Sequence, residues 1–249
     1  MAKQYSIEVQ KIMDNMTLKE KIAQMIMVRV RSDYYSSDSY SKKEIENWII
    51  NQKVGGLITF DGNGNVHGMF NNHQYFQSIS NVPLLIASDL ERGAGQQMKG
   101  ATLFPSNMAI AATGDPYNAY LQGTITAEEA KELGIHIIFA PVLDVNNNPN
   151  NPIINLRSYG DNPDFVSEFG LQFIKGIQDQ GLYACPKHFP GHGNTSIDSH
   201  ASLPIINSSI SELEEIELKP FKNAVNNNVK MMMMGHIAVP ALDSSKKPA

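Results

Sequence analysis

Short segments that are apolar almost throughout, with little alternation between apolar and polar residues, restrict the fold of this chain more than any other feature. They lie at 26–30, 54–60, 82–89, 135–144, 182–185 and 229–236. Between them are stretches with helical periodicity, the longest at 116–133 and 163–180. Strands that are apolar on both faces and that alternate with helices are typical of a parallel sheet covered by helices. The sequence therefore predicts an α/β fold.

Capping residues and glycines mark the expected helix ends. Thr17 and Glu20 form the Thr-x-x-Glu pattern in which each side chain accepts from the main-chain N–H of the other, so a helix is expected directly after Thr17. Ser41 and Glu44 repeat this pattern. Gly181 stands where a left-handed residue would end the helix before the fifth strand. Further helices are expected over 66–79, 105–112 and 211–226.

Two architectures fit this alternation: an open doubly wound sheet and a TIM-type (β/α)₈ barrel. No glycine-rich phosphate loop follows the first strand, which weighs against the dinucleotide-binding open sheet. Polar residues follow four of the strands: Asp89, Asp144, Lys187 with His188, and His236. Functional groups at the carboxyl ends of several strands are typical of the barrel, which we therefore expect. The methionine run at 231–234 is expected to be buried core of the sixth strand.

The composition restricts the possible partners. The chain has 249 residues, 42% of them hydrophobic, and a net charge of −5 without a basic run. Nucleic acid and an anionic membrane surface are therefore not expected as partners, and a small neutral or weakly charged ligand fits better. No apolar run approaches the roughly 18 residues of a membrane span, and no signal peptide precedes residue 16. As written the chain is expected to be cytoplasmic, although a periplasmic or exported protein that has lost its signal peptide would have the same sequence. Cys185, the single cysteine, is expected to be a small apolar core residue.

One loop concentrates the residues that can carry out chemistry. Lys187, His188, His192, Asp198 and His200 lie within fourteen residues, and a proline and two glycines among them prevent a helix. The segment follows directly on the fifth expected strand. An imidazole, whose reference pKa is about 6.5, can both give and take a proton near neutral pH. We therefore expect the functional site at this strand end.

The segment Lys-His-Phe-Pro-Gly-His-Gly at 187–193, followed by Asp-Ser-His at 198–200, resembles the signature loop of a known family. That family is the N-terminal domain of glycoside hydrolase family 3, and within it the β-N-acetylglucosaminidase (β-N-acetylhexosaminidase) branch. Further landmarks of the family follow in the same order along essentially the whole chain, at 16–25, 54–58, 89–91, 139–144 and 157–160. The resemblance implies that 1–249 form one (β/α) barrel domain.

The resemblance also implies an activity. Enzymes of this branch remove terminal N-acetylglucosamine from glycosides, cell-wall muropeptides among them, with retention of configuration and through a covalent glycosyl-enzyme intermediate. A histidine oriented by an aspartate replaces one carboxylate of the usual pair, and in this sequence these residues would be His200 and Asp198. Neither a cofactor nor a metal ion is implied. The positions that match sugar-binding residues are Asp89, Arg157, Lys187 and His188.

The sequence departs from the family pattern at Gln97. Where the family often has a second arginine shortly after Asp-x-Glu-Gly-Gly-Arg, this chain has glutamine. The charged contact of that arginine with the substrate would be lost, which leaves the group attached to the sugar open.

Two other functions remain open at the level of the sequence. A metal-dependent hydrolase is the alternative enzyme class, because His188-x₃-His192 and Asp198-x-His200 could offer imidazole and carboxylate ligands. A saccharide-binding module without hydrolytic activity is the alternative outside the enzymes. In that case Asp89, Arg157, Lys187 and His188 would hold a sugar whose bonds stay intact.

The end of the chain leads to a further expectation. In the family, the nucleophile is an aspartate on a later strand, and Asp243 does not match its context. The expected strands end at the sixth, near residue 236, whereas a closed barrel of this type has eight. We therefore expect the barrel to lack its C-terminal part and the isolated chain to be inactive. Unpaired sheet edges would favour association unless a further domain or a second chain completes the barrel.

Overall fold

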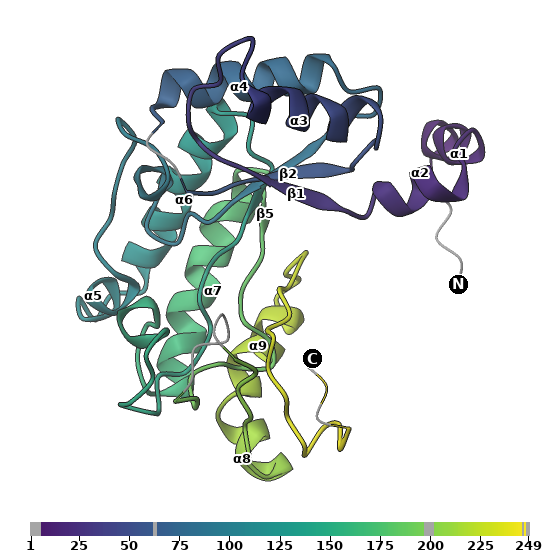
Figure 1. Cartoon of the computed structure of the whole chain (residues 1–249). Coiled ribbons are helices and arrows are strands. Elements are labelled where there is room, and N and C mark those ends of the chain that lie inside the picture. The colour runs from purple at the N-terminus through teal and green to yellow at the C-terminus, as the bar shows by residue number, and fades with distance from the viewer. Residues whose placement is uncertain (1–5, 62–63, 197–201, 246, 248–249) are drawn as a thin grey trace.

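The computed structural model describes residues 6–61, 64–196, 202–245 and 247. At its centre is a parallel sheet of five strands, whose order across the sheet is their order in the sequence (Figure 1). In register, Val30 pairs with Thr59 and Thr59 with Ser88, and Ile138 pairs with both Ser88 and Ala184, so the carboxyl ends of the strands meet at one edge. The strands are β1 (Met27–Val30), β2 (Gly56–Thr59), β3 (Leu85–Ser88), β4 (Ile137–Ile138) and β5 (Tyr183–Ala184).

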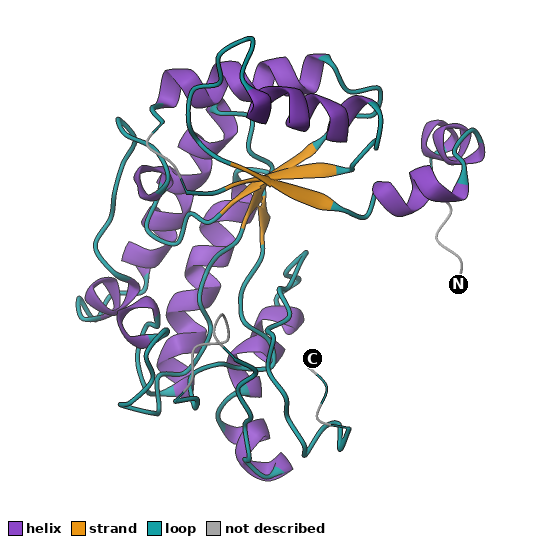
Figure 2. Cartoon of the chain, viewed as in Figure 1, coloured by secondary structure: helices purple, strands orange, loops and turns teal. Residues whose placement is uncertain are grey.

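The helices that connect the strands lie on one side of the sheet (Figure 2). Right-handed crossovers that always step in the same direction place every helix on the same face, whereas a doubly wound sheet reverses its order at a switch point. The barrel-type α/β fold expected from the sequence is therefore confirmed, although the described residues form an open sheet. The helices are α1 (Ile7–Asp14), α2 (Leu18–Ala23), α3 (Tyr40–Ile50), α4 (Val66–Ser78), α5 (Asn107–Ala111), α6 (Tyr117–Glu132), α7 (Pro163–Asp179), α8 (Ile210–Glu215) and α9 (Leu218–Asn226), with one-turn 3₁₀ helices η1 (Ala94–Gln96) and η2 (Asn155–Arg157).

The two faces of the sheet are packed differently. Successive side chains of a strand point to opposite faces. In β3, Ile86 belongs to the large core under the helices, which includes Phe76 and Phe173. Its neighbour Ala87 packs on the other face in a small cluster with Ile137 and Cys185. Cys185 is a buried free thiol, as the sequence predicts.

Most expected elements are present, but two helix starts need comment. Thr17 and Glu20 form the expected capping box at α2. The cap expected at Ser41 is wrong: α3 begins at Tyr40, and the side chain of Ser39 accepts from the N–H of Lys42. A serine can cap with its own hydroxyl alone, so the acidic partner on which the prediction relied is not required.

The last part of the chain departs most from the predicted elements. The single helix expected over 211–226 is two helices, α8 and α9, which are separated at Ile216 and Glu217. The strand expected over 229–236 is reduced to an isolated parallel bridge between Phe189 and Met234. The prediction that the methionine run is buried core is wrong for Met234, which is 51% exposed. Met231 and Met233 are partly buried against the small cluster of Ala87, Ile137 and Cys185, and Met232 is partly buried against the large core under the helices.

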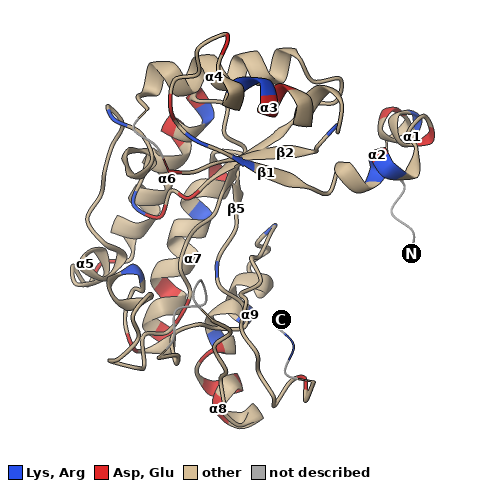
Figure 3. Cartoon of the chain, in the orientation of Figure 1, with Lys and Arg blue, Asp and Glu red and all other residues tan. Residues whose placement is uncertain are grey.

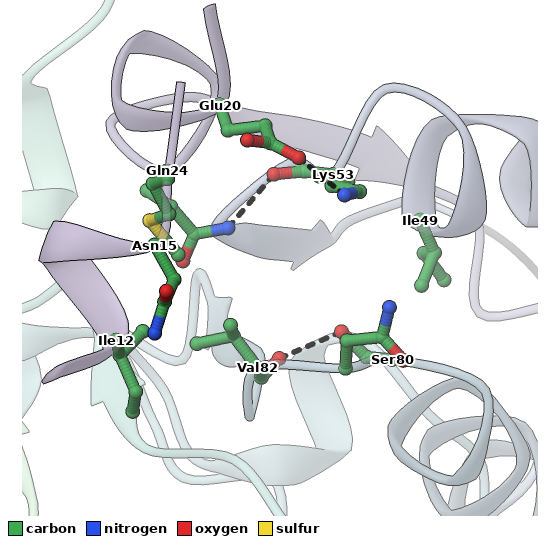
Figure 4. Close-up of a pocket in the computed structure, with 10 residues that line it drawn as sticks. Ile12, Asn15, Glu20, Gln24, Ile49, Lys53, Ser80 and Val82 are labelled. Carbon is green, nitrogen blue, oxygen red and sulfur yellow. Dashed lines mark hydrogen bonds and ion pairs between the residues drawn. The ribbon is translucent and has the colours of Figure 1, made fainter. Parts of the chain in front are cut away.

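At the amino ends of the strands, α2 is attached to the loop before β2. Glu20 forms an ion pair with Lys53, and Gln24 donates to the main-chain oxygen of Lys53 at 2.8 Å (Figure 4). A pocket of about 290 Å³ lies beside these contacts. Its lining residues all precede β1, β2 or β3, so the pocket is at the opposite end of the sheet from Asp89 and Lys187.

Charged residues of both signs are distributed over the molecule, with a concentration of acidic residues on α8 (Figure 3). No helix in the described part of the chain is both long and apolar enough to cross a bilayer.

Candidate active site

The candidate site lies where β3, β4 and β5 end. Asp89 directly follows β3, and Lys187 and His188 follow β5. Arg157 reaches the same place from η2, in the long loop after β4. The structure therefore brings the four residues that the sequence predicts to bind a sugar to one edge of the sheet, although the first and the last of them are 99 positions apart. The common edge formed by parallel strand ends accounts for this convergence.

Glu91 is the centre of the charged group. Its carboxylate accepts two parallel hydrogen bonds from Arg157, from Nη2 at 2.8 Å and from Nε at 3.0 Å. The same carboxylate lies 2.7 Å from Nζ of Lys187, which in turn donates to Asp89 at 2.5 Å. Two acids and two bases thus form a chain of charge-assisted contacts, the type of hydrogen bond that is strongest in proteins.

Burial differs within this group. The side chains of Lys187 and Glu91 are only 2% and 7% exposed, whereas those of Asp89 and Arg157 are 21% and 31% exposed. Asp89 and Arg157 therefore form the accessible side of the group, and Lys187 and Glu91 lie beneath them. A ligand at the strand ends would therefore contact the carboxylate of Asp89 and the guanidinium of Arg157, whose orientations are fixed by Lys187 and Glu91.

The ion pairs determine the protonation of Glu91. Burial alone would raise its pKa, but the attraction of Lys187 and the hydrogen bonds and charge of Arg157 outweigh burial and lower the pKa to about 2. Arg157 responds in the opposite direction: burial opposes its charge, yet its contacts with Glu91 raise its pKa overall. Both groups are therefore ionised at neutral pH.

A second group surrounds Asp144, which follows β4 and is fully buried. One carboxylate oxygen accepts from the N–H of His192 at 2.6 Å and from the N–H of His188 at 3.2 Å. The other lies 2.7 Å from Nδ1 of His188. Burial opposes ionisation, but His188 and these N–H groups lower the pKa of Asp144. An ionised acceptor requires the proton of His188 on Nδ1, which leaves Nε2 for a ligand.

The ring of His192 has a different partner from the ring of His188. Burial lowers its pKa, and its Nδ1 lies 2.7 Å from the hydroxyl of Thr195. Its ring centroid is 6.0 Å from that of His188. Among the described residues, no group of three or more histidine, cysteine or acidic side chains is arranged to hold a metal ion. The other half of the alternative metal pattern, Asp198 and His200, lies outside the described residues, as does the predicted acid/base dyad that those two residues would form.

Gln97 stands where the family often has an arginine, and it binds main chain. Its side chain is buried, its Nε2 donates to the main-chain oxygen of Asp89 at 3.0 Å, and its Oε1 accepts from the N–H of Asp61 at 3.0 Å. It thereby links the segment after β2 to the segment after β3. Both functional atoms of the amide are occupied by these contacts.

The sequence marks Asp144 only as a strand-end residue without an assigned role, and Glu91 only as a family landmark. The predicted sugar-binding residues include two cations, Lys187 and Arg157, but one anion, Asp89. Because a buried cation needs an anionic partner, this imbalance could have identified Glu91. His236, also expected at this edge, is exposed. Burial raises the pKa of the Cys185 thiol to about 11, which fits a core residue.

Comparisons with known proteins agree on one family. The family model described as "Glycosyl hydrolase family 3 N terminal domain" matches residues 17–249. Beta-hexosaminidase A from Pseudoalteromonas piscicida is 36% identical over 256 residues, covering 93% of this chain and 42% of that protein. The structure of a glycoside hydrolase family 3 β-N-acetylglucosaminidase from Paenibacillus sp. str. FPU-7 has a TM-score of 0.85 and 37% identity, over 94% of this chain and 44% of that one.

A third comparison includes a bound sugar derivative. The structure of NagZ from Neisseria gonorrhoeae in complex with N-trifluoroacetyl-D-glucosamine has a TM-score of 0.77 and 28% identity, over 90% of this chain and 66% of that one. The chain thus spans less than half of the P. piscicida and Paenibacillus proteins and about two thirds of the N. gonorrhoeae one.

Proposed function

The chain belongs to glycoside hydrolase family 3, and from this membership we propose that it forms the sugar-binding part of a retaining β-N-acetylglucosaminidase. The observation that carries the proposal is the convergence of Asp89, Arg157, Lys187 and His188 at one strand-end edge. Relatives named β-hexosaminidase and β-N-acetylglucosaminidase support it.

The geometry suits recognition of a neutral sugar. Sugar hydroxyl groups both donate and accept, so a site needs carboxylate acceptors and cationic donors side by side. Asp89 supplies the acceptor and Arg157 the donor on the accessible side, while Nε2 of His188 offers a further contact. Lys187 and Glu91, beneath them, fix the orientation of both. The paired charges compensate one another, so a neutral ligand can bind without leaving a buried charge unpaired.

For the chemical step, we assign proton transfer to His200, oriented by Asp198. An imidazole held through one nitrogen by a carboxylate can protonate the leaving oxygen with the other and later accept a proton from water. The covalent nucleophile is not assigned to Asp243, whose exposed carboxylate accepts from the N–H and the hydroxyl of Ser245. The nature of the group attached to the sugar, including the cell-wall glycosides that the resemblance implies, stays a prediction.

Calorimetric titration of the chain with N-acetylglucosamine tests the sugar site. We expect binding by the wild-type chain and binding weakened about tenfold or more by Asp89→Ala, which removes a charge-assisted contact of about 1.5–3 kcal/mol. We expect a similar loss in Lys187→Ala, which removes the ion pair that orients Asp89. Asp38→Ala, an exposed acid outside the site, is the matched control. Equal affinity in all four proteins would overturn the assignment.

The same proteins distinguish the hydrolase from a saccharide-binding module. A catalytically competent form should release the aryl group from an aryl N-acetylglucosaminide. Sugar binding with no such release in any form of the protein would favour the module.

A further inference from the structure

Two buried amide side chains lie directly behind the ion pair of Glu91 and Arg157. Asn107 is the first residue of α5 and Gln122 belongs to α6, and each is 1% exposed. Nδ2 of Asn107 donates to the main-chain oxygen of Arg157 at 2.8 Å. Nε2 of Gln122 donates to the main-chain oxygen of Glu91 at 3.1 Å and lies 3.4 Å from Oδ1 of Asn107. The two amides therefore join the main chains of two residues that are 66 positions apart in the sequence.

The orientation of Gln122 is determined by its surroundings. Its amide faces two acceptors, the carbonyl of Glu91 and Oδ1 of Asn107, so only the NH₂ group can point toward them. The opposite atom, Oε1, is buried and has no hydrogen-bond partner among the described residues. A buried polar atom without a partner costs stability. Packing alone would favour an apolar residue at this buried position of α6.

The carbonyls that the amides hold lie in irregular backbone. Glu91 follows β3 in a turn, and Arg157 is in the one-turn helix η2. Neither segment has a strand ladder or a long helix to fix its position. The two parallel bonds between Glu91 and Arg157 require their main chains to keep one separation and one orientation, and a shift of about 1 Å at a site can weaken function by orders of magnitude.

We propose that Asn107 and Gln122 are a positioning pair, which holds the Glu91–Arg157 ion pair, and through Glu91 also Lys187, in the orientation that binds the sugar. The role in sugar binding rests on the proposed function. The role in holding Arg157 does not, because it can be measured without a ligand.

Three variants separate this role from general core packing. Gln122→Glu keeps the shape of the side chain but removes the donors to the Glu91 carbonyl. Asn107→Asp removes the donor to the Arg157 carbonyl. Thr126→Val is the control, because the hydroxyl of Thr126 is also buried on α6 but donates only to the main-chain oxygen of Gln122 in the same helix.

The primary measurement is the NMR resonance of the Arg157 Nε–H group in ligand-free protein, assigned by its loss in Arg157→Lys. We expect a sharp resonance, protected from exchange, in the wild-type chain and in Thr126→Val. In Gln122→Glu and Asn107→Asp we expect it to broaden or move toward the position of exposed arginines. The second measurement is calorimetry with N-acetylglucosamine, in which the two amide variants should bind about tenfold more weakly than the control.

The outcomes are distinct. An unchanged Arg157 resonance in both amide variants overturns the positioning role. Absence of sugar binding by the wild-type chain contradicts the proposed function, while the resonance still decides the positioning role. If neither amide variant folds, hydrogen exchange in the wild-type chain decides instead. The role requires the side-chain amide protons of Asn107 and Gln122 to be protected along with Nε–H of Arg157, and rapid exchange of either amide overturns it.

Discussion

At the scale of single residues, the molecule depends on a buried carboxylate that is kept ionised. Glu91 has Arg157 on one side and Lys187 on the other. Removing one member of a buried ion pair leaves the others uncompensated and typically costs about 3–5 kcal/mol. Glu91 is therefore as important for the stability of the site as the residues that would touch a ligand.

We expect Glu91→Gln to lower the free energy of unfolding by about 3–5 kcal/mol at pH 7, measured by urea denaturation. The pKa of Glu91 in the folded protein is about 2, below the ordinary 4.5, so its stabilising effect is complete above pH 4.5 and is lost as the pH falls toward 2. The difference in the free energy of unfolding between wild type and variant should thus be smaller at pH 3 than at pH 7. Glu44→Gln, at an exposed site, is the control, and a difference that stays constant from pH 7 to pH 3 would contradict the ion-pair account.

The dyad assigned to proton transfer leads to a prediction about leaving groups. In the catalytically active form of the protein, His200→Ala should lower the rate on ordinary glycosides about 100-fold or more. A glycoside with an activated aryl leaving group, which departs without protonation, should be affected much less, and Asp198→Asn should show a milder form of the same pattern. Steady-state kinetics with both substrates measures this. An equal loss on both would mean that His200 binds or supports the substrate without transferring a proton.

At the scale of elements, the sequence predicted the alternation of strands and helices because burial on both faces leaves a clear apolar signal. The ends of the elements were less predictable. β4 and β5 have two paired residues each, although the apolar segments around them are longer, since apolar character persists in the buried chain beyond the last ladder bond. Contacts between residues that are distant in the sequence also override local patterns. The main chain and Cβ of Glu217 pack against Gly191, and the helix expected to run through Glu217 is interrupted there.

The start of α3 offers a direct test at this scale. Ser39→Ala should lower the free energy of unfolding by about 1 kcal/mol, because the hydroxyl of Ser39 accepts from the N–H of Lys42 at the helix start. Ser41→Ala, two residues further on and exposed within the helix, serves as the control. It should change the free energy of unfolding by no more than about 0.3 kcal/mol. Urea denaturation of both variants measures the difference. A larger loss for Ser41→Ala would restore the cap predicted from the sequence.

In the candidate site, too, residues within one loop were easier to predict from the sequence than contacts between distant parts of the chain. A single loop with lysine and histidines identified the strand end of β5. The partners of that loop come from other strand ends, and their pairing depends on a fold that one sequence reveals only in outline. The specific contacts of Glu91, Asp144, Asn107 and Gln122 therefore required the structure, because each of these residues bonds a partner more than 30 positions away.

At the scale of the whole molecule, the sheet has an exposed edge. β1 pairs with β2 on one side, and the described residues provide no strand on its other side. The segment that leads into β1 also carries exposed apolar side chains, including Met25 at 81% exposure and Leu18 at 74%. An unpaired strand edge and exposed apolar residues each favour pairing with other chains.

We therefore expect the chain to self-associate increasingly with concentration, as measured by sedimentation velocity. A double variant, Leu18→Lys with Met25→Lys, should reduce association by replacing two exposed apolar side chains before β1 with like charges. Leu242→Lys, also at an exposed apolar residue but near the C-terminal end of the chain, should leave association unchanged. Monomeric behaviour of the wild-type chain at the highest concentration reached would contradict this view of the edge.

The buried thiol of Cys185 has a practical consequence. It lies two residues before Lys187, and burial raises its pKa to about 11, so the thiol is almost entirely protonated at pH 7. Because it is the single cysteine of the chain, an alkylating reagent meets one target, and that target becomes reactive only when the end of β5 opens. The rate of alkylation therefore reports how often the end of β5 opens. It can be followed by mass spectrometry, without any label introduced by mutation.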